Sequence, residues 1–220
     1  MRNSSSSSPT DKVDILKIAV TGSAASGKSS VCRRLQELGL QVVSSDFLAR
    51  EAVRPESPAF RKIVKHFGKQ VLKSDGTLDR KRLRHIIVRD ERNRGVLESF
   101  VHPRIIDLIH SHIAAAAKEG RAVIAVEVPL LFELSLDDEF DVVLLIVAER
   151  RMQVERLARR DRVSPAEAEA LLKIQLPDKK KIANSDYIIH NTGPIEQMVK
   201  QVDEFFEKFC KKIQKNKESA

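Results

Sequence analysis

The eight residues GSAASGKS, at positions 22–29, restrict the possible folds of this chain more than any other segment. They fit the pattern G-x-x-x-x-G-K-[ST], in which backbone N–H groups of a glycine-containing loop surround a phosphate group. A short apolar run at residues 15–20 precedes the loop, and Val31, Leu35 and Leu38 follow it at helical spacing. This order predicts a phosphate-binding loop that connects a buried strand to an amphipathic helix.

Each part of this loop has a chemical role if it binds a nucleotide; the alternative is an incidental glycine-rich turn. Gly22 and Gly27 allow the backbone to turn tightly, and the helix that begins near Lys28 directs its positive end toward a phosphate. Lys28 would neutralise the β- and γ-phosphates of ATP, and the Ser29 hydroxyl would bind Mg²⁺. The candidate ATP-binding residues are Gly22, Ser23, Ala24, Ala25, Ser26, Gly27, Lys28, Ser29 and Ser30, of which Ser30 is expected to face away.

Five apolar runs of strand length alternate with segments of helical periodicity. The runs lie at residues 15–20, 40–45, 122–128, 141–147 and 186–190. They are apolar almost throughout, which is typical of strands that are covered on both faces. Strands that alternate with long helical segments predict an α/β fold with a doubly wound, parallel five-stranded sheet.

One domain is expected at residues 14–210, because the length of 220 residues and the apolar content of 42% suffice for a single core. Residues 56–120 show helical patterns, including a helix over residues 104–118, and no good strand, which predicts a helical insertion between the second and third strands. The Ser-rich residues 1–13 are expected to form a disordered lead, and residues 211–220 a basic, solvated tail.

The last helix is predicted from apolar residues at spacings of three and four. These residues are Ile195, Met198, Val199, Val202, Phe205, Phe206 and Phe209. The stripe favours packing in the core over a surface for a partner.

The net charge of +8 comes from 39 basic and 31 acidic residues that are mostly interspersed. Interspersed charges are typical of a solvated surface, and an anionic small-molecule substrate explains the excess as well as a nucleic acid does. We therefore expect no nucleic-acid partner. The alternative, a nucleic-acid-associated ATP-binding module, rests on the basic segment at residues 209–217.

The longest apolar run, residues 142–148, is of strand length, so no membrane partner is expected. Cys32 and Cys210 lack metal-ligand spacing and are expected to be unpaired thiols. Because the N-terminal residues lack a secretory signal, a cytoplasmic location is favoured, with the mitochondrion as the alternative. The sequence assigns no oligomeric state.

The acceptor of the phosphoryl group is expected at the carboxyl edge of the sheet, where parallel strands end and ligands bind. Asp46 follows the second strand there, so its carboxylate is placed to accept a proton from a hydroxyl or to orient Mg²⁺. The alternative is an N-cap for a helix that begins at Phe47. Arg50, one turn later, would contact an anionic substrate group or form a surface salt bridge.

Several further motifs occur in a characteristic order along the chain. They are TGSAASGKSS, SSDFLAR, FG at Phe67, DGTLDRKRLR, HP at His102, EVPLLFE and RRDRVS. In this order and spacing the chain resembles the dephospho-coenzyme A kinase family of P-loop kinases over about residues 16–209. The combination is specific, since nucleotide kinases in general do not share VPLLFE after the third strand.

The resemblance implies transfer of the ATP γ-phosphoryl group, with Mg²⁺, to the ribose 3′-hydroxyl of dephospho-CoA. It implies that residues 56–120 hold the CoA substrate and that residues 150–183 form a helical lid. Asp46 resembles the catalytic carboxylate, Arg160 a lid arginine that closes on the phosphates, and Arg156 a companion of that arginine. A nucleoside or metabolite kinase of the same architecture is the rival.

Other roles follow from the same resemblance. Asn191 and Gly193 lie where the family holds the adenine of ATP. Glu127 stands where related proteins often keep a carboxylate that reaches Mg²⁺ through water. The candidate substrate-binding residues are Asp46, Arg50, His102, Pro129, Leu130, Leu131, Phe132 and Arg156.

Each of these assignments has an alternative. For residues 129–132 it is ordinary core packing, and for His102 it is a helix cap or a packed side chain. For Arg156 it is an exposed charge on a helix, and for residues 191–193 it is a plain turn. The sequence also departs from the family at two places. Ala24 and Ala25 lie in a loop that is usually richer in glycine, and Arg162 stands where glycine is common.

Overall fold

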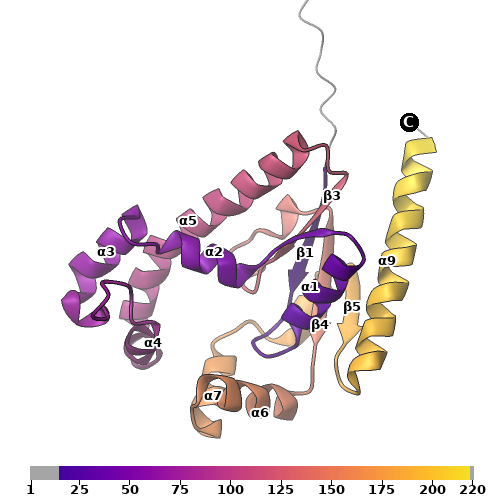
Figure 1. The fold of residues 1–220 in the computed structure, drawn as a ribbon. Helices are drawn as coiled ribbons and strands as arrows, with labels where there is room; N and C mark the ends of the chain where they lie inside the picture. The colour runs from indigo at the N-terminus through magenta and orange to yellow at the C-terminus, as the bar shows by residue number, and fades with distance from the viewer. Residues whose placement is uncertain (1–14, 219–220) are drawn as a thin grey trace, which may run out of the picture.

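The computed structural model describes residues 15–218. Its centre is a five-stranded parallel sheet with the strand order β2-β3-β1-β4-β5 (Figure 1). The strands are β1 (Leu16–Thr21), β2 (Gln41–Val43), β3 (Val123–Glu127), β4 (Val142–Val147) and β5 (Tyr187–His190). The predicted doubly wound parallel sheet is confirmed. The second strand is shorter than predicted, because Ser44 already caps the following helix.

Helices cover both faces of this sheet. Ile18 and Val20 of β1 point to the face covered by α1 (Lys28–Glu37) and α9 (Ile195–Glu218). Ala19, between them, points to the opposite face, where α5 (Glu91–Lys118) packs. Successive residues of a strand point to opposite faces, so a strand with two covered faces must be apolar throughout.

Helix α9 supplies the predicted apolar stripe. Met198, Val202, Phe205 and Phe209 are buried against the sheet, whereas Ile195 at the start of the helix is exposed. The helix continues to Glu218, so helical backbone extends into the segment that the sequence analysis sets apart as a tail. The predicted lead at residues 1–13 lies outside the described residues.

The insertion between β2 and β3 is helical, as predicted. It contains α2 (Ser45–Ala52), α3 (Pro58–Phe67), the 3₁₀ turn η1 (Lys69–Val71), α4 (Arg80–Arg89) and the first part of α5. Figure 1 shows α3 and α4 set apart from the sheet. They share a small core of their own, formed by Phe60, Ile63, Phe67, Val71, Leu78 and Leu83.

The predicted start of a helix at residue 104, directly after His102 and Pro103, is wrong. Both lie inside α5, which begins at Glu91. Pro103 lacks the N–H that would bond to the Ser99 carbonyl, at a cost of about 3 kcal/mol in an isolated helix. Packing of α5 against α2, α3, α4 and β3 offsets this cost. A proline therefore did not mark a helix boundary here.

Three helices follow β4 at the carboxyl edge of the sheet: α6 (Arg150–Asp161), α7 (Pro165–Lys173) and α8 (Asp178–Ala183). Leu157, Ala168 and Leu172 form a small cluster, against which Ala24 and Ala25 of the glycine-containing loop pack. This contact gives the two alanines of the loop a packing role. Arg162 ends α6 in a left-handed conformation, with φ of 55°, which explains why glycine suits this position.

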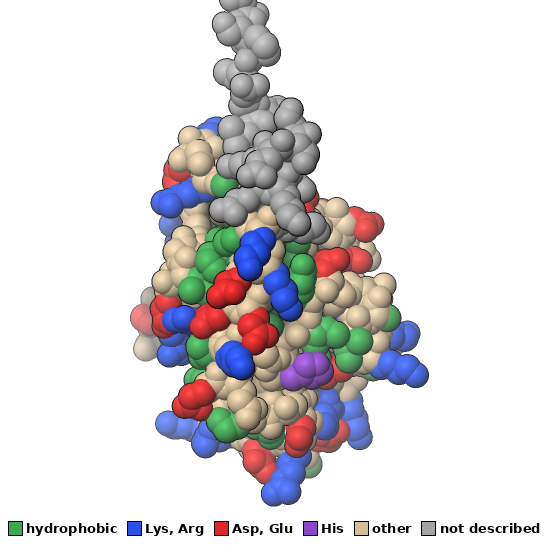
Figure 2. Space-filling view, turned by 90° about the vertical axis from the view of Figure 1, so that its right-hand side faces the viewer, with side chains coloured by type: hydrophobic (Ala, Val, Ile, Leu, Met, Phe, Trp, Pro, Cys, Tyr) green, Lys and Arg blue, Asp and Glu red, His purple; other side chains and the backbone are tan. Residues whose placement is uncertain are grey.

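The surface agrees with the interpretation of interspersed charge. On the face that carries α9, basic and acidic side chains lie next to one another (Figure 2). Cys32 and Cys210 are free thiols, as predicted. Within residues 15–218, no helix combines the length and apolarity needed to span a membrane.

Candidate active site

The loop at residues 22–29 requires glycine at both of its glycine positions. Gly22 has φ of +144°, and a Cβ atom there would lie 2.3 Å from the Ile146 carbonyl oxygen. Gly27 caps α1 with φ of +103°, and a Cβ atom there would lie 2.1 Å from Nδ2 of Asn191. Any larger residue would displace the loop from β4 or from Asn191.

Lys28 lies beneath this loop and is buried. Its ammonium Nζ donates to the carbonyl oxygens of Gly22 at 2.9 Å and of Ser23 at 3.0 Å. Burial lowers the pKa of Lys28 to about 8, although the carboxylate of Glu127 opposes this shift. The cations Lys181 and Arg160 lower the pKa further. The loop therefore holds a cation whose charge an added phosphate would stabilise.

Nucleotide binding is expected to depend on pH through Lys28. Because its folded-state pKa of about 8 is below the usual 10.5, the charged form destabilises the ligand-free fold below pH 8, and this penalty disappears as the pH rises to 10.5. A bound phosphate favours the ammonium form of Lys28. Binding of ATP between pH 8 and 9 should therefore be accompanied by uptake of a proton by Lys28, and ATP should bind more weakly above pH 8. Calorimetric titration in Tris and HEPES buffers measures this uptake; affinity that rises with pH would contradict it. Lys28→Met should abolish the uptake.

Asn191, predicted to lie near the adenine of ATP, supports the loop with its side chain. Its Nδ2 donates to the Ser26 carbonyl oxygen at 2.8 Å, and the residue is buried. Gly193, two residues later, follows β5 but does not line the cavity in front of the loop. The described contacts of Asn191 thus stabilise the loop from behind.

Asn191→Ala is expected to destabilise the protein by about 1–3 kcal/mol, because the Ser26 carbonyl loses its buried donor. Thermal denaturation should show a melting temperature lower by several degrees. Asn184→Ala removes an exposed amide that bonds to the Lys180 carbonyl, and it should change stability by less than about 0.5 kcal/mol. Equal melting temperatures for the two variants would contradict the bracing role.

A second set of contacts braces the loop from α8 and from the turn between α7 and α8. Ser23 Oγ donates to Asp178 Oδ1 at 2.6 Å, and the Ala24 N–H donates to Gln175 Oε1 at 2.8 Å. The fully buried Lys181 forms an ion pair with Glu133 at 3.3 Å. These residues were not predicted from the sequence. The run of basic residues that contains Lys181 gave no sign that one lysine is buried.

A cavity of about 330 Å³ opens in front of the loop and gathers most of the predicted catalytic groups. Its lining includes Lys28, Ser29, Asp46, Glu127, Arg156 and Arg160. These residues come from α1, α2, the end of β3 and α6, which are far apart in the sequence. The carboxyl edge of the sheet therefore brings a cationic loop and a carboxylate to the same space, as the sequence predicted.

Asp46 does not serve as the helix cap that was its alternative role. Ser44 is the N-cap of α2, and its hydroxyl accepts from the Asp46 N–H at 3.2 Å. Asp46 itself lies in the first turn, where it is exposed and lines the cavity. Because Ser44 provides the cap, the Asp46 side chain does not have to serve in that role.

Glu127 ends β3 and is buried beside the start of α2. One of its oxygens, Oε2, accepts from the Ser45 N–H at 3.4 Å. Glu127 therefore contacts the start of α2 as well as lining the cavity. Within residues 15–218, no group of three or more His, Cys, Asp or Glu side chains forms a metal site by itself.

The four arginines at residues 156–162, in the last turns of α6 and at its C-cap, divide into two groups. Arg160 and Arg156 line the cavity, whereas Arg159 and Arg162 do not. The Arg160 guanidinium binds both oxygens of Asp161, with Nε–Oδ1 at 3.0 Å and Nη2–Oδ2 at 3.2 Å. Its charge is close enough to Lys28 to affect the pKa of that lysine. Asp161 thus holds Arg160 at the site.

An apolar cavity of about 330 Å³ adjoins the first and shares Asp46, Glu127 and Pro129 with it. Leu130 and His102 line it, and desolvation lowers the pKa of His102.

The prediction that all four residues 129–132 form such a wall is wrong for Leu131 and Phe132. Leu131 is fully buried in the core on the α5 side, and Phe132 packs against that core. Arg50 is exposed and lines neither cavity.

The sequence profile of the dephospho-CoA kinases matches residues 16–197. The chain belongs to the dephospho-CoA kinase family. It is 40% identical over 191 residues to the dephospho-CoA kinase of Geobacter sulfurreducens, which covers 87% of this chain and 97% of that protein. Identity to the Bacillus thuringiensis dephospho-CoA kinase is 38% over 178 residues, with coverage of 81% and 89%.

The fold is also similar to that of a solved dephospho-CoA kinase. The Campylobacter jejuni structure aligns with a TM-score of 0.66 and 28% identity, and it covers 89% of this chain and 97% of that one. The range matched by the dephospho-CoA kinase profile includes every residue that lines the cavity, from Ala24 to Gln175. The family assignment therefore covers the whole candidate site.

Proposed function

We propose that this ATP-dependent dephospho-CoA kinase transfers the γ-phosphoryl group of ATP directly to the ribose 3′-hydroxyl of dephospho-CoA. One observation carries the proposal: a single cavity contains Lys28 and Ser29 of the phosphate-binding loop and, from a different strand connection, Asp46. A donor and an acceptor that meet there need no covalent enzyme intermediate.

The donor side is proposed to act by positioning and charge. Lys28 and the loop N–H groups would hold the β- and γ-phosphates, and Arg160 would stabilise the charge on the phosphoryl group in transit. Arg156 lines the same cavity and adds a second guanidinium. Helices α6–α8 are proposed to act as a lid, because they carry these arginines and also contact the loop through Gln175.

Mg²⁺ is proposed as the metal cofactor, and the residues present fit it. The cavity offers the Ser29 hydroxyl and the carboxylates of Asp46 and Glu127. This sparse oxygen set suits Mg²⁺, which usually keeps several waters and binds the phosphates of its nucleotide. Ser29 would bind the ion directly, with Asp46 or Glu127 in its outer shell. The bound ion would supply neutralisation of phosphate charge.

The acceptor side is proposed to depend on Asp46. Its exposed carboxylate would accept a hydrogen bond from the 3′-hydroxyl, orient that oxygen toward the phosphorus and take up its proton. The adjoining apolar cavity would hold an uncharged part of dephospho-CoA, with Pro129, Leu130 and His102 in contact. The helical insertion would thus supply one wall of the acceptor site, and residues 191–193 would lie near the adenine of ATP.

A panel of acceptors tests this function. Purified protein is supplied with Mg·ATP and with dephospho-CoA, AMP, cytidine or shikimate, and ADP release is coupled to NADH oxidation. We expect turnover with dephospho-CoA to exceed that with the other three by at least 100-fold. Preference for AMP, cytidine or shikimate would assign the site to another small-molecule kinase.

A further inference from the structure

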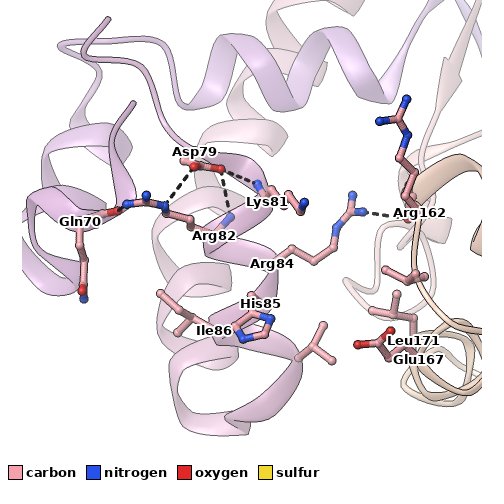
Figure 3. A pocket seen from close by; sticks show the side chains of 13 residues that line it. Gln70, Asp79, Lys81, Arg82, Arg84, His85, Ile86, Arg162, Glu167 and Leu171 are labelled. Carbon is pink, nitrogen blue, oxygen red and sulfur yellow. Dashed lines mark hydrogen bonds and ion pairs between the residues drawn. The ribbon is translucent and has the colours of Figure 1, made fainter. Parts of the chain in front are cut away.

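A cleft of about 660 Å³ separates α4 from the turn between α6 and α7 and from α7 itself. It has twice the volume of either cavity at the candidate active site. Figure 3 shows Arg84 reaching from α4 across this space toward the segment that carries Arg162. The roles assigned so far to the loop, to Asp46 and to the apolar cavity leave this cleft unexplained.

The cleft is connected to the active site through Asp161. Arg84 Nη1 forms an ion pair with Asp161 Oδ2 at 2.9 Å, and the same carboxylate holds Arg160. Asp161 is nearly buried, so these two arginines approach one another around one shielded carboxylate. Arg160 lines the phosphate cavity and Arg84 lines the cleft. The two spaces therefore share a wall.

The same face of α4 also reaches the acceptor carboxylate. Arg80 lies one helical turn before Arg84, and its Nη2 donates to the Ala49 carbonyl of α2 at 3.1 Å. Partial desolvation and the charge of Arg50 lower the pKa of Arg80, whereas Asp46 opposes this shift. Arg80 is thus an electrostatic neighbour of Asp46, and cationic side chains continue along α4 from Asp46 to the cleft.

Basic side chains in the lining of the cleft (Lys81, Arg82, Arg84 and Arg162) outnumber the acidic ones (Asp79, Asp161 and Glu167). The Glu167 carboxylate accepts from the N–H and the hydroxyl of Ser164. The Asp79 carboxylate caps α4, accepting from the N–H groups of Lys81 and Arg82, and its other oxygen pairs with the Arg82 guanidinium at 3.3 Å. The Arg84–Asp161 ion pair joins one guanidinium nitrogen to the carboxylate, and the Arg84 side chain is 45% exposed. Arg84 therefore still has guanidinium N–H groups directed at the cleft.

We propose that this cleft binds the 5′-diphosphate arm of the acceptor, with Arg84 in contact with the diphosphate. The inference rests on the proposed function. The diphosphate of dephospho-CoA is attached to the ribose whose 3′-hydroxyl reacts, so it must lie within one sugar of Asp46. The adjoining apolar cavity offers no row of cations for it, whereas α4 does. A guanidinium matches two phosphate oxygens at once and suits such a group.

Steady-state kinetics of Arg84→Gln test this assignment. Losing a charged hydrogen bond to the diphosphate should raise KM for dephospho-CoA by about 10- to 100-fold. KM for ATP should change by less than twofold, and equilibrium binding of dephospho-CoA should weaken with its KM. Arg84→Lys should retain part of the affinity for dephospho-CoA, because lysine keeps the positive charge but lacks the planar guanidinium group. Arg92→Gln, an exposed arginine at the start of α5, is the matched control and should leave both KM values unchanged.

The possible kinetic results distinguish failure of the proposed diphosphate site from failure of the proposed function. An unchanged KM for dephospho-CoA in active Arg84→Gln enzyme overturns the inference and leaves the proposed function intact. A fall in kcat with an equal rise in both KM values also overturns it, because Arg84 would then act through Asp161 and Arg160 on the donor. Wild-type protein that makes no CoA overturns the proposed function and this inference together.

Discussion

Asp46→Asn is expected to lower kcat for CoA formation by about 10²- to 10⁴-fold, the usual contribution of a positioned proton acceptor. Asparagine keeps the size of the side chain and the start of α2, whose cap is the Ser44 hydroxyl. It removes the negative charge that would receive the hydroxyl proton. KM for ATP should change by less than about threefold, because the loop and Lys28 are untouched. Quenched-flow or coupled measurements of ADP release give both constants.

The matched control for Asp46 is Glu51→Gln, which removes a carboxylate from the same helix. Glu51 pairs with Arg54 and does not line the cavity. Its loss should leave kcat within twofold. A near-normal kcat for Asp46→Asn would remove Asp46 from the chemistry and leave only an ATP-binding fold with a neighbouring carboxylate.

Lys28→Met is expected to lower kcat/KM for ATP by about 10²- to 10³-fold, because one cation aimed at the transferring group is lost. The fold should persist, since methionine fills a similar volume and removes a buried ammonium whose burial is costly. The carbonyl oxygens of Gly22 and Ser23 lose a donor, so a small change in melting temperature is expected. Circular dichroism and the coupled assay measure the two effects separately.

Lys65→Met supplies the control for the lysine experiment, because Lys65 is exposed on α3 and distant in sequence from the loop. It should have wild-type kinetics. Lys28→Met enzyme with a normal kcat/KM would show that the loop does not bind ATP phosphates in the proposed way.

Local patterns explain why the sheet and the position of Asp46 could be predicted. Strands covered on both faces are apolar throughout, so the segments around Ile18 and Leu144 were recognisable without a structure. The glycine-containing loop fixed the direction of β1, and parallel strands end at one edge. These two facts predict that Asp46 lies at the same edge of the sheet as Lys28, and both residues line one cavity there.

Features that depend on packing between distant segments were beyond such patterns. Leu131 and Phe132 were predicted to form a pocket wall, but Leu131 is buried in the core and Phe132 packs against it. The sequence does not show which side of the turn after β3 faces the sheet. The helix predicted to begin after Pro103 begins at Glu91 instead, because tertiary contacts of α5 outweigh the low helix propensity of proline. The Arg84–Asp161 pair joins the insertion to α6 and has no local signature.

The most direct measurement identifies the product of the complete reaction. Purified protein is incubated with dephospho-CoA and Mg·ATP, and the product is analysed by mass spectrometry and ³¹P NMR. The predicted result is coenzyme A with a phosphomonoester on the ribose 3′-oxygen, formed in the same amount as ADP. ADP without coenzyme A, or a phosphate attached elsewhere on the acceptor, would contradict the transfer from the loop to the hydroxyl at Asp46.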